Sequence, residues 1–303
     1  MSALVVDPTA VAQAYRERLR ADVADLDEPL RIVGFLGQDD GPAATYARYA
    51  AKGCESVGIE FDLRRTDAAG VEAAIGDANA DPDVHGIFLY YPIGAPGADR
   101  WLRELVDPRK DVEGMHAFWS RCLYENRRWL DASRMVRAIL PCTPLAILKL
   151  LGEAGLRRTG AAAPLEGVTA CVINRSDIVG RPLSAMLAND GAEVISLDLD
   201  GAQVFEPAIG RHAHSVRDSD VDRAAALALS DVVITGVPSP DFELVRAEEI
   251  KDGAICVNFS QFRNFAPDVP ERAASFVPRV GPMTVTMAMR NALRLYRTVQ
   301  SHR

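Results

Sequence analysis

The chain has 303 residues, of which 48% are hydrophobic and 25% are charged, a composition typical of a folded protein long enough for two domains. Its 34 Lys and Arg residues against 42 Asp and Glu residues give a net charge of −8, which argues against a broad surface for nucleic acid or anionic lipid. The 5 cysteines are widely spread and never form a CxxC pair, so we expect neither a disulfide framework nor a zinc site.

The amino-terminal segment gives no sign of targeting or of a membrane role. Its residues, MSALVVDPTAVAQAYRERLRADV, include acids and lack a cleavable signal pattern. No apolar run approaches the ~20 residues that a membrane-spanning helix needs. We therefore expect a cytoplasmic protein that binds neither membranes nor nucleic acid.

In chain order, the first stretch alternates Ala-rich amphipathic segments with short β-branched ones, which is typical of βαβ units. It predicts helices at residues 10–26, 44–58 and 68–80 and strands at residues 31–37, 59–65 and 84–92. Residues 93–140 contain mostly turn-forming residues. A helix follows at residues 141–151, with Thr143 as the expected N-cap and Pro144 as the first helical residue.

The second stretch follows a Gly- and Ala-containing connection at residues 155–167. It predicts strands at residues 168–174, 192–198, 231–237 and 254–260 and helices at residues 180–190 and 284–300. Residues 210–220, GRHAHSVRDSD, form a polar stretch within it. The chain is therefore predicted to be an α/β protein with two domains, divided near residue 150.

The segment ACVINRSDIVGRPLSAMLAND carries the first candidate site. A buried strand ends at Asn174, and a helix begins near Ile178 to Gly180, so free backbone N–H groups and the helix dipole face the space above the strand end. That arrangement suits a pyrophosphate. The segment lacks the GxGxxG fingerprint, and an ordinary strand-turn-helix remains the alternative.

The next predicted strand ends at Asp198, where a dinucleotide fold accepts hydrogen bonds from the adenosine ribose. A carboxylate there repels a 2′-phosphate, which favours NAD over NADP. Arg175 could bind such a phosphate and is the counter-argument. A further alternative is that Asp198 or Asp200 only caps the following loop.

The segment VINRSDIVGRPLSAMLANDGA resembles the cofactor motif of the methylenetetrahydrofolate dehydrogenase/cyclohydrolase family. The resemblance continues, in the family's order, through GIFLYYP, DPRKDVEGMH, LPCTPLAIL, DVVITGVPS and VGPMTVTMAMRN, and it is nearest to the NAD-dependent monofunctional branch. It implies a folate-binding catalytic domain at residues 1–150, an NAD-binding Rossmann-like domain at residues 151–275, and a loop and helix at residues 276–303 that return to the first domain. It also implies a homodimer, with the folate in the cleft between domains.

The chain departs from the bifunctional members of that family. They carry a Tyr-x-x-x-Lys pair whose lysine serves the cyclohydrolase step, and this chain places Tyr46 and Ala50 at those positions. Lys52 lies two residues further on, about 200° around a helix, so it cannot simply substitute. Tyr90 stands where those members have a glutamine that bonds the lysine.

DPRKDVEGMH replaces the usual DVDG with DVEG, so Asp111 and Glu113 are the candidate acids for the pterin. Glu113 is the better positional match, and spacing alone does not choose between them. Removing a hydride from the carbon between N5 and N10 needs alignment rather than a proton carrier. Hydrolysis of the resulting methenyl cation does need one. The resemblance therefore predicts NAD-dependent oxidation of 5,10-methylenetetrahydrofolate without cyclohydrolase activity.

The candidate residues form two sets. Those expected at the folate are Tyr46, Ala50, Lys52, Leu89, Tyr90, Tyr91, Pro92, Asp111, Glu113, Gly281 and Pro282, with Tyr46, Tyr90, Asp111 and Glu113 as the catalytic ones. Those expected at NAD are Asn174, Arg175, Ser176, Ile178, Gly180, Asp198, Gly236, Val237 and Asn258.

The sequence gives less support for a metal site or a reactive cysteine. His212 and His214 have no carboxylate or cysteine at metal-ligand spacing, so no metal is expected, and Cys142 is taken as a buried small side chain. Three rival functions are a bifunctional enzyme that uses another base such as Lys52, a non-catalytic NAD- or folate-binding protein, and a dehydrogenase for another one-carbon carrier.

Overall fold

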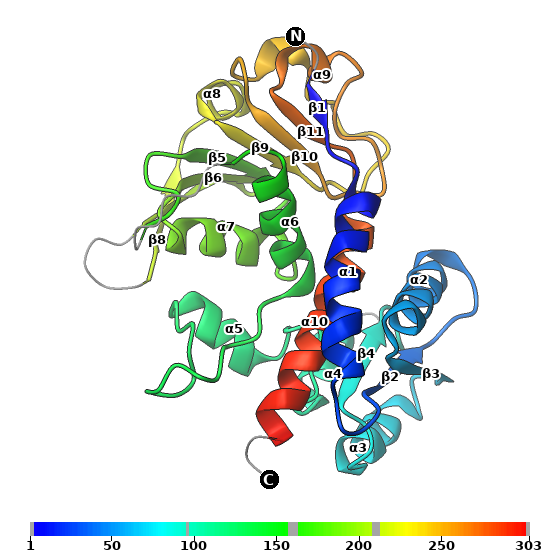
Figure 1. The fold of residues 1–303 in the computed structure, drawn as a ribbon. Helices are drawn as coiled ribbons and strands as arrows, with labels where there is room; N and C mark the ends of the chain where they lie inside the picture. Colours follow the sequence, from blue (N-terminus) through cyan, green and yellow to red (C-terminus); the bar gives the residue numbers. More distant parts are fainter. Residues whose placement is uncertain (1–2, 95–96, 157–162, 208–212, 301–303) are drawn as a thin grey trace. The chain divides into compact units, whose positions relative to one another are not determined.

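The computed structural model describes residues 3–94, 97–156, 163–207 and 213–300. The chain divides into two compact units (Figure 1). The first unit comprises Met1–Val11, Cys122–Arg128 and Thr143–Met283, and the second comprises Ala12–Arg121, Trp129–Cys142 and Thr284–Arg303.

The first unit contains an eight-stranded sheet of order β1-β11-β10-β9-β5-β6-β7-β8, parallel from β1 to β6 and antiparallel from β6 to β8. Its strands are β1 (Leu4–Val5), β5 (Thr169–Ile173), β6 (Glu193–Asp198), β7 (Gly201–Glu206), β8 (Ser215–Ser219), β9 (Val232–Thr235), β10 (Ile255–Asn258) and β11 (Ser275–Val277). The central strands β9 and β10 are buried at every residue, as expected for parallel strands covered on both faces.

Helices and one 3₁₀ turn accompany this sheet. They are α6 (Cys142–Glu153), α7 (Gly180–Asn189), α8 (Arg223–Leu229), η1 (Ala247–Glu249) and α9 (Val269–Arg272). The side chain of Asp222 accepts a hydrogen bond from the Ala225 N–H and so caps α8. The predicted α/β class with a Rossmann-like sheet is confirmed.

The sequence prediction differs from this unit in several places, since it omits β11, α8, η1 and α9. Residues 201–206 and 215–219 form the antiparallel strands β7 and β8, and β8 falls within the stretch expected to be a polar connection. β8 is exposed along most of its length, which removes the hydrophobic alternation that predicts a strand. β1 pairs with β11, so the first residues join this unit instead of the other. Finally, α6 begins at Cys142, so Thr143 lies in its first turn and is not its N-cap.

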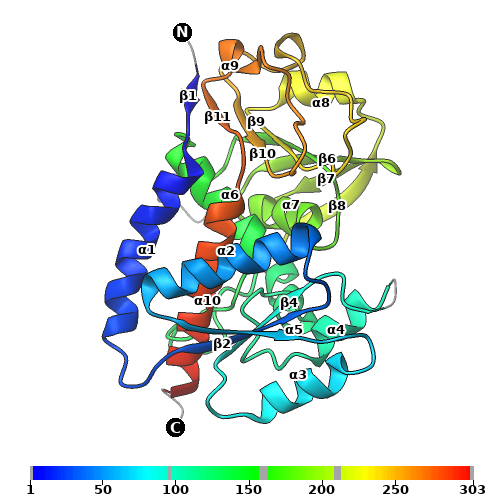
Figure 2. The same cartoon turned by 90° about the vertical axis from the view of Figure 1, so that its right-hand side faces the viewer.

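The second unit contains a three-stranded parallel sheet of order β3-β2-β4. Its strands are β2 (Arg31–Leu36), β3 (Glu60–Arg65) and β4 (Gly86–Tyr90). Its helices are α1 (Pro8–Ala24), α2 (Gly41–Val57), α3 (Val71–Ala80), α4 (Asp99–Leu105), α5 (Ala117–Tyr124) and α10 (Gly281–Gln300). Part of each of α1, α5 and α10 is assigned to the first unit. Figure 2 shows α2 and α3 on opposite sides of the sheet.

The alternation of side chains along β4 divides the core of this unit. Ile87 and Leu89 pack with residues of α3 and α4, whereas Phe88 and Tyr90 face Tyr46 of α2. The predicted strands of this unit are all present. Helix α10 begins at Gly281, three residues before the predicted start.

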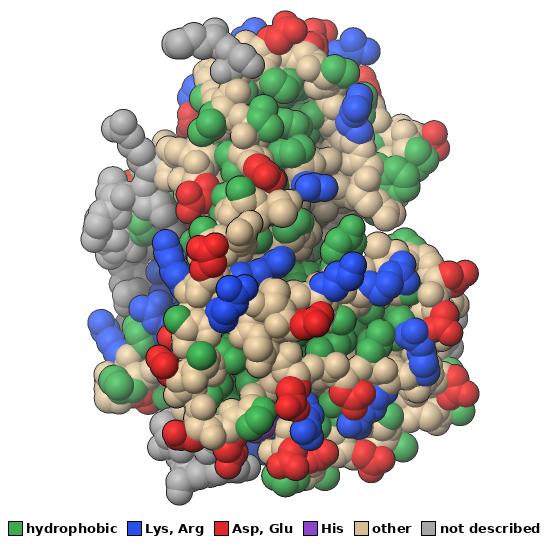
Figure 3. Space-filling view, turned by 45° about the vertical axis from the view of Figure 1, so that its right-hand side comes forward, with side chains coloured by type: hydrophobic (Ala, Val, Ile, Leu, Met, Phe, Trp, Pro, Cys, Tyr) green, Lys and Arg blue, Asp and Glu red, His purple; other side chains and the backbone are tan. Residues whose placement is uncertain are grey.

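No helix among the described residues is long and apolar enough to cross a membrane. On the face shown in Figure 3, acidic and basic side chains are interspersed with apolar and polar ones.

Candidate functional site

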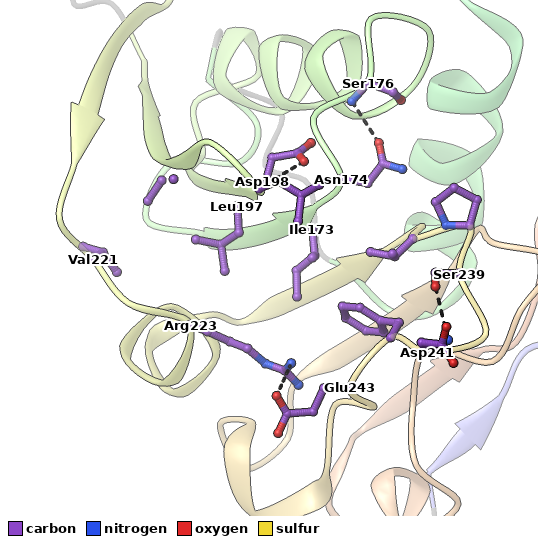
Figure 4. Close-up of a pocket in the computed structure, with 16 residues that line it drawn as sticks. Ile173, Asn174, Ser176, Leu197, Asp198, Val221, Arg223, Ser239, Asp241 and Glu243 are labelled. Atoms are coloured by element: carbon purple, nitrogen blue, oxygen red, sulfur yellow. Dashed lines mark hydrogen bonds and ion pairs between the residues drawn. The ribbon is translucent and has the colours of Figure 1, made fainter.

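A cavity of about 760 Å³ opens at the carboxyl ends of β5, β6 and β9. The strand order reverses at β5, with β6 on one side and β9 on the other, and ligands of open α/β sheets bind at such a point. Figure 4 shows Asn174 and Asp198 on one side of the cavity and the Arg223–Glu243 ion pair on the other.

The turn after β5 is built for a close approach of helix and strand. Asn174 has a φ of 102°, and its amide accepts from the Ser176 N–H at 2.9 Å and donates to the Gly236 carbonyl at 2.7 Å. A Cβ on Gly180 would overlap the Asn174 carbonyl oxygen. Only glycine therefore allows α7 to begin directly above the strand end.

Asp198 lies at the tip of β6 and lines the cavity. One of its carboxylate oxygens accepts from the Arg175 N–H and the other from the Leu199 N–H. Because a carboxylate has about four acceptor positions, two remain for a ligand. The cavity edge thus carries a negative charge with free acceptor capacity.

The Arg175 side chain is turned away from this cavity. Its guanidinium is 2% exposed, pairs with Asp200, and donates to the carbonyls of Ser196 at 3.0 Å and Gly201 at 3.1 Å. Arg223 lines the cavity, but it forms ion pairs with Glu243 and Glu249. Both arginines near the cavity are therefore neutralised by carboxylates.

The sequence-predicted cofactor residues do not all line the cavity. Asn174, Ser176, Asp198 and Val237 do, whereas Arg175, Ile178, Gly180, Gly236 and Asn258 do not. A Cβ on Gly236 would overlap the Phe259 ring, so that glycine serves packing. The Asn258 amide bonds the Phe262 carbonyl and the Ser260 N–H, which holds the following loop.

Sequence reasoning missed several residues that line the cavity. They are mainly apolar and include Leu199, Val221, Pro238 and Phe242. Leu199 is fully exposed, which is unusual for leucine next to a predicted ligand-binding acid. That position, directly after a strand tip, is the signal that could have indicated it.

The second unit gathers the predicted folate residues around an aromatic cluster. The Phe88 and Tyr90 rings stack with centroids 4.7 Å apart, and Tyr46 meets each edge-on at 5.8 Å. Gly34 leaves room for Tyr90, since a Cβ there would lie 2.9 Å from its ring. Burial raises the pKa of both tyrosine hydroxyls well above the usual value, so they stay neutral near pH 7.

Ala50 and Lys52 lie on different sides of α2. Ala50 is 2% exposed and shares the buried face with Ala47 and Cys54, whereas Lys52 is exposed. This is the orientation that the rotation of about 200° predicts. Position 50, where the sequence analysis expected the counterpart of the family lysine, thus carries only a buried methyl group.

Asp111 and Glu113 are both buried but differ in their partners. The Asp111 carboxylate accepts four backbone N–H groups, those of residues 113, 114, 115 and 116, at 2.8 to 3.1 Å. Among the described residues, Glu113 accepts a hydrogen bond only from the Leu89 N–H, which reaches Oε2 at 3.2 Å. Burial, and then the nearby Asp111, raise the pKa of Glu113 to about 8. Asp111 therefore holds the turn, and Glu113 keeps an oxygen free for a further hydrogen bond.

The turn that carries these acids is fixed from remote parts of the same unit. The Asn291 amide of α10 donates to the carbonyls of Val112 at 3.0 Å and Leu140 at 2.9 Å. Cys142 donates its N–H to the Glu113 carbonyl and its thiol to the Val112 carbonyl. Burial raises the pKa of this thiol, which agrees with a structural cysteine.

The remaining predicted folate residues are spread out. The Leu89 side chain points into the core with α3 and α4, so only its backbone serves Glu113. Tyr91 precedes Pro92 through a cis peptide bond, and its hydroxyl is buried without a partner in the described chain. Gly281 and Pro282 begin α10 and belong to the first unit, so they are not grouped with the tyrosines.

The histidine pair can be judged only in part, because His212 lies outside the described residues. His214 stacks on Phe205 at 5.6 Å and bonds the Asn189 amide oxygen at 3.0 Å. The described residues contain no group of three His, Cys, Asp or Glu side chains that could hold a metal ion.

The fold and the cavity define an α/β protein with a dinucleotide-binding sheet of the Rossmann kind and a smaller α/β unit. Two family models match: the catalytic domain of tetrahydrofolate dehydrogenase/cyclohydrolase over residues 6–113, and the NAD(P)-binding domain of the same enzymes over residues 141–300. The chain belongs to this family, and the prediction from its sequence motifs is confirmed.

Relatives of known activity are similar over nearly the whole chain. "Methylenetetrahydrofolate dehydrogenase [NAD(+)]" of Schizosaccharomyces pombe is 39% identical, covering 97% of this chain and 93% of its own, and the Saccharomyces cerevisiae protein of that name is 43% identical, covering 89% and 87%. The solved NAD-dependent 5,10-methylenetetrahydrofolate dehydrogenase of S. cerevisiae superimposes with a TM-score of 0.91 at 38% identity over 99% of both chains.

Proposed function

We propose that this protein oxidises 5,10-methylenetetrahydrofolate to 5,10-methenyltetrahydrofolate with NAD and does not hydrolyse the product. Similarity to the NAD-dependent dehydrogenases supports the oxidation. One observation carries the second part: Ala50, which aligns with the family lysine, is a buried methyl group, and the neighbouring Lys52 is exposed.

The cavity at β5, β6 and β9 fits the adenosine half of NAD. Asp198 has acceptor capacity for the ribose hydroxyls, and Leu199 and Phe242 offer apolar surface for the adenine. The charge of Asp198 opposes a 2′-phosphate, and Arg175 is held by Asp200 and does not compensate. When bound, NAD supplies the hydride acceptor for the reaction. These contacts support NAD rather than NADP.

For the folate, Glu113 is the better of the two acids. An aminopyrimidine ring presents N–H donors, and Glu113 has an oxygen free of hydrogen bonds in the described chain, whereas both oxygens of Asp111 bind backbone N–H groups. Tyr46 offers an aromatic surface beside it, and its neutral hydroxyl is a poor base. We assign pterin binding to Glu113 and packing against the pterin to Tyr46.

The chemistry of the two steps explains how one activity is kept without the other. Loss of hydride from the carbon between N5 and N10 releases no proton, so the enzyme has to hold the carbon in place and tolerate a cation. Hydrolysis of the cation requires activation of water and movement of protons. The raised pKa values of Tyr46 and Tyr90 make these hydroxyls unsuitable as bases near neutral pH.

The test is a pair of assays on the purified protein. Oxidation of methylenetetrahydrofolate, followed by formation of NADH or NADPH, should be rapid with NAD and slow with NADP, and loss of methenyltetrahydrofolate should proceed at the spontaneous rate. A bifunctional family member serves as the positive control for hydrolysis. Hydrolysis clearly above the spontaneous rate refutes the monofunctional assignment, and binding of both ligands without NADH formation refutes the catalytic one.

We also propose, on the family resemblance, that the protein is a homodimer joined through its NAD-binding unit. Sedimentation equilibrium over a range of concentrations measures the mass directly. A mass equal to that of one chain at micromolar concentration contradicts this proposal.

A further inference from the structure

A second cavity, of about 740 Å³, lies in the second unit, and the residues that line it are distant in the sequence from the aromatic cluster. It is formed by the chain at residues 129–137 and by the last turns of α10. The backbone closes there into a small hairpin, in which Trp129 pairs with Arg137 and the Leu130 N–H bonds the Val136 carbonyl. No step of the proposed dehydrogenase reaction uses this cavity.

Arginines dominate its walls. Arg134, Arg137, Arg294 and Arg297 line it, and the Arg137 guanidinium lies over the Trp129 ring, 4.3 Å from the ring centre. Arg290 lies one helical turn before Arg294, and its Nη1 is buried with no hydrogen-bond partner in the described chain. Among the described residues, no carboxylate pairs with Arg137, Arg290 or Arg294.

Two acids lie close to these arginines, but neither forms an ion pair with Arg137, Arg290 or Arg294 in the described chain. Asp131 also lines the cavity and keeps its negative charge. Its carboxylate accepts from the Ser133 hydroxyl and from the Met135 and Val136 N–H groups of its own loop, and it pairs with no arginine of the described residues. Arg297 pairs with Asp22 at 3.0 Å and is thereby neutralised.

The arginines also perturb one another. Burial, and then Arg290 and Arg137, lower the pKa of Arg294 to about 10. The pKa of Arg290 is lowered by burial first and then by Arg137. Like charges at close range without a counter-charge cost free energy. The chain as a whole has more acidic than basic residues, with a net charge of −8, yet none of these acids pairs with the three arginines in the described chain. A ligand that brings negative charge would remove this cost.

We propose that the cavity lined by Trp129, Arg137 and Arg294 is a binding site for a phosphate group, either as the free ion or as a phosphate ester. Guanidinium groups present paired N–H donors that match the oxygens of phosphate. A dianion in the cavity offsets the charges of Arg137 and Arg294, for which the described residues supply no carboxylate partner. Trp129, already stacked under Arg137, borders the same space.

Inorganic phosphate is the first probe. It is titrated into protein saturated with NAD, so that the cofactor cavity is occupied, at an ionic strength held constant with chloride. Binding is followed by calorimetry and by the emission of Trp129, one of 3 tryptophans, with Trp129→Phe identifying its share of the signal. We expect saturable binding with a dissociation constant on the order of 1 mM.

Arg137→Gln and Arg294→Gln should each weaken this binding roughly tenfold. Arg64→Gln is the matched control, because it removes the same charge from an exposed arginine of the same unit that pairs with Asp62, and its binding should equal that of the parent. In chloride alone, Arg294→Gln should melt no lower than the parent, since repulsion is relieved, and phosphate should raise the melting temperature of the parent more than that of the variant.

Equal phosphate binding by the parent and both cavity variants overturns the proposal, as does the absence of saturable binding in the parent. Glycerol phosphate and adenosine monophosphate, titrated in the same way, distinguish the two sources. Tighter binding than that of phosphate supports an ester as the ligand, and equal binding supports the free ion.

Discussion

The exchange of Asp198 for serine tests the cofactor assignment most directly. In the structure this carboxylate accepts two backbone N–H groups and borders the cavity. A hydrogen bond to a charged group contributes about 1.5–3 kcal/mol net. Loss of the ribose hydrogen bonds should therefore lower kcat/KM with NAD by roughly 10- to 100-fold.

The same exchange should help NADP. Two unit charges about 5 Å apart near a protein surface repel by about 3 kcal/mol before salt screening. Removing the carboxylate should raise kcat/KM with NADP by roughly tenfold. The ratio of NAD to NADP kcat/KM should thus fall by about two to three orders of magnitude.

The ratio is the quantity to measure, because both cofactors experience any general loosening of the turn at Asn174. Initial rates at saturating methylenetetrahydrofolate give it. Asp200→Asn is the companion variant, since it releases the Arg175 guanidinium while leaving Asp198 in place, and it should raise activity with NADP without lowering activity with NAD. An unchanged ratio in Asp198→Ser refutes the role given to this carboxylate.

Three further predictions follow from the geometry. The pKa of Glu113 is raised from 4.5 to about 8, so between these pH values the folded protein keeps a proton that the unfolded chain loses. The free energy of unfolding should therefore fall as the pH rises, by up to roughly 1.4 kcal/mol per pH unit. Thermal melts of Glu113→Gln should show a smaller fall over this range. Gly180→Ala should destabilise the protein by about 2–4 kcal/mol, because the new methyl group overlaps the Asn174 carbonyl. It should also weaken NAD binding measured by calorimetry. The control is Gly152→Ala, where the new methyl group enters open space, and it should be neutral or stabilising by up to about 1 kcal/mol. The double exchange Ala50→Lys with Tyr90→Gln should raise methenyltetrahydrofolate hydrolysis above the spontaneous rate, measured by loss of methenyl absorbance, and Lys52→Ala should leave that rate unchanged.

The sequence predicted the buried strands well because their pattern depends on burial alone. β2, β4, β5, β6, β9 and β10 lie within the predicted strand ranges, since each is rich in β-branched and apolar residues that a covered sheet requires. β8 was missed because its residues are mostly exposed and polar. A strand at the edge of a sheet is held by backbone hydrogen bonds, which any side chain permits.

The sequence predicted where the site residues lie on the strands and turns better than it predicted how their side chains are oriented. Asp198 was expected at a strand tip, and it lies there. The direction of the Arg175 guanidinium depends on Asp200 and on the carbonyls of Ser196 in β6 and Gly201 in β7, and the sequence did not predict the β6–β7 hairpin. Likewise, Asp111 and Glu113 differ through backbone N–H groups that converge only in the folded turn.

The hydrogen bond from Asn291 to the Val112 carbonyl joins residues 179 positions apart. The acid-bearing turn therefore gains this support only when α10 has been made. Until α10 docks, a nascent chain on the ribosome has the strands that surround the turn but not the amide that ties it to Leu140. Competence for folate recognition should thus be acquired late in biosynthesis, after most of the polypeptide has left the exit tunnel.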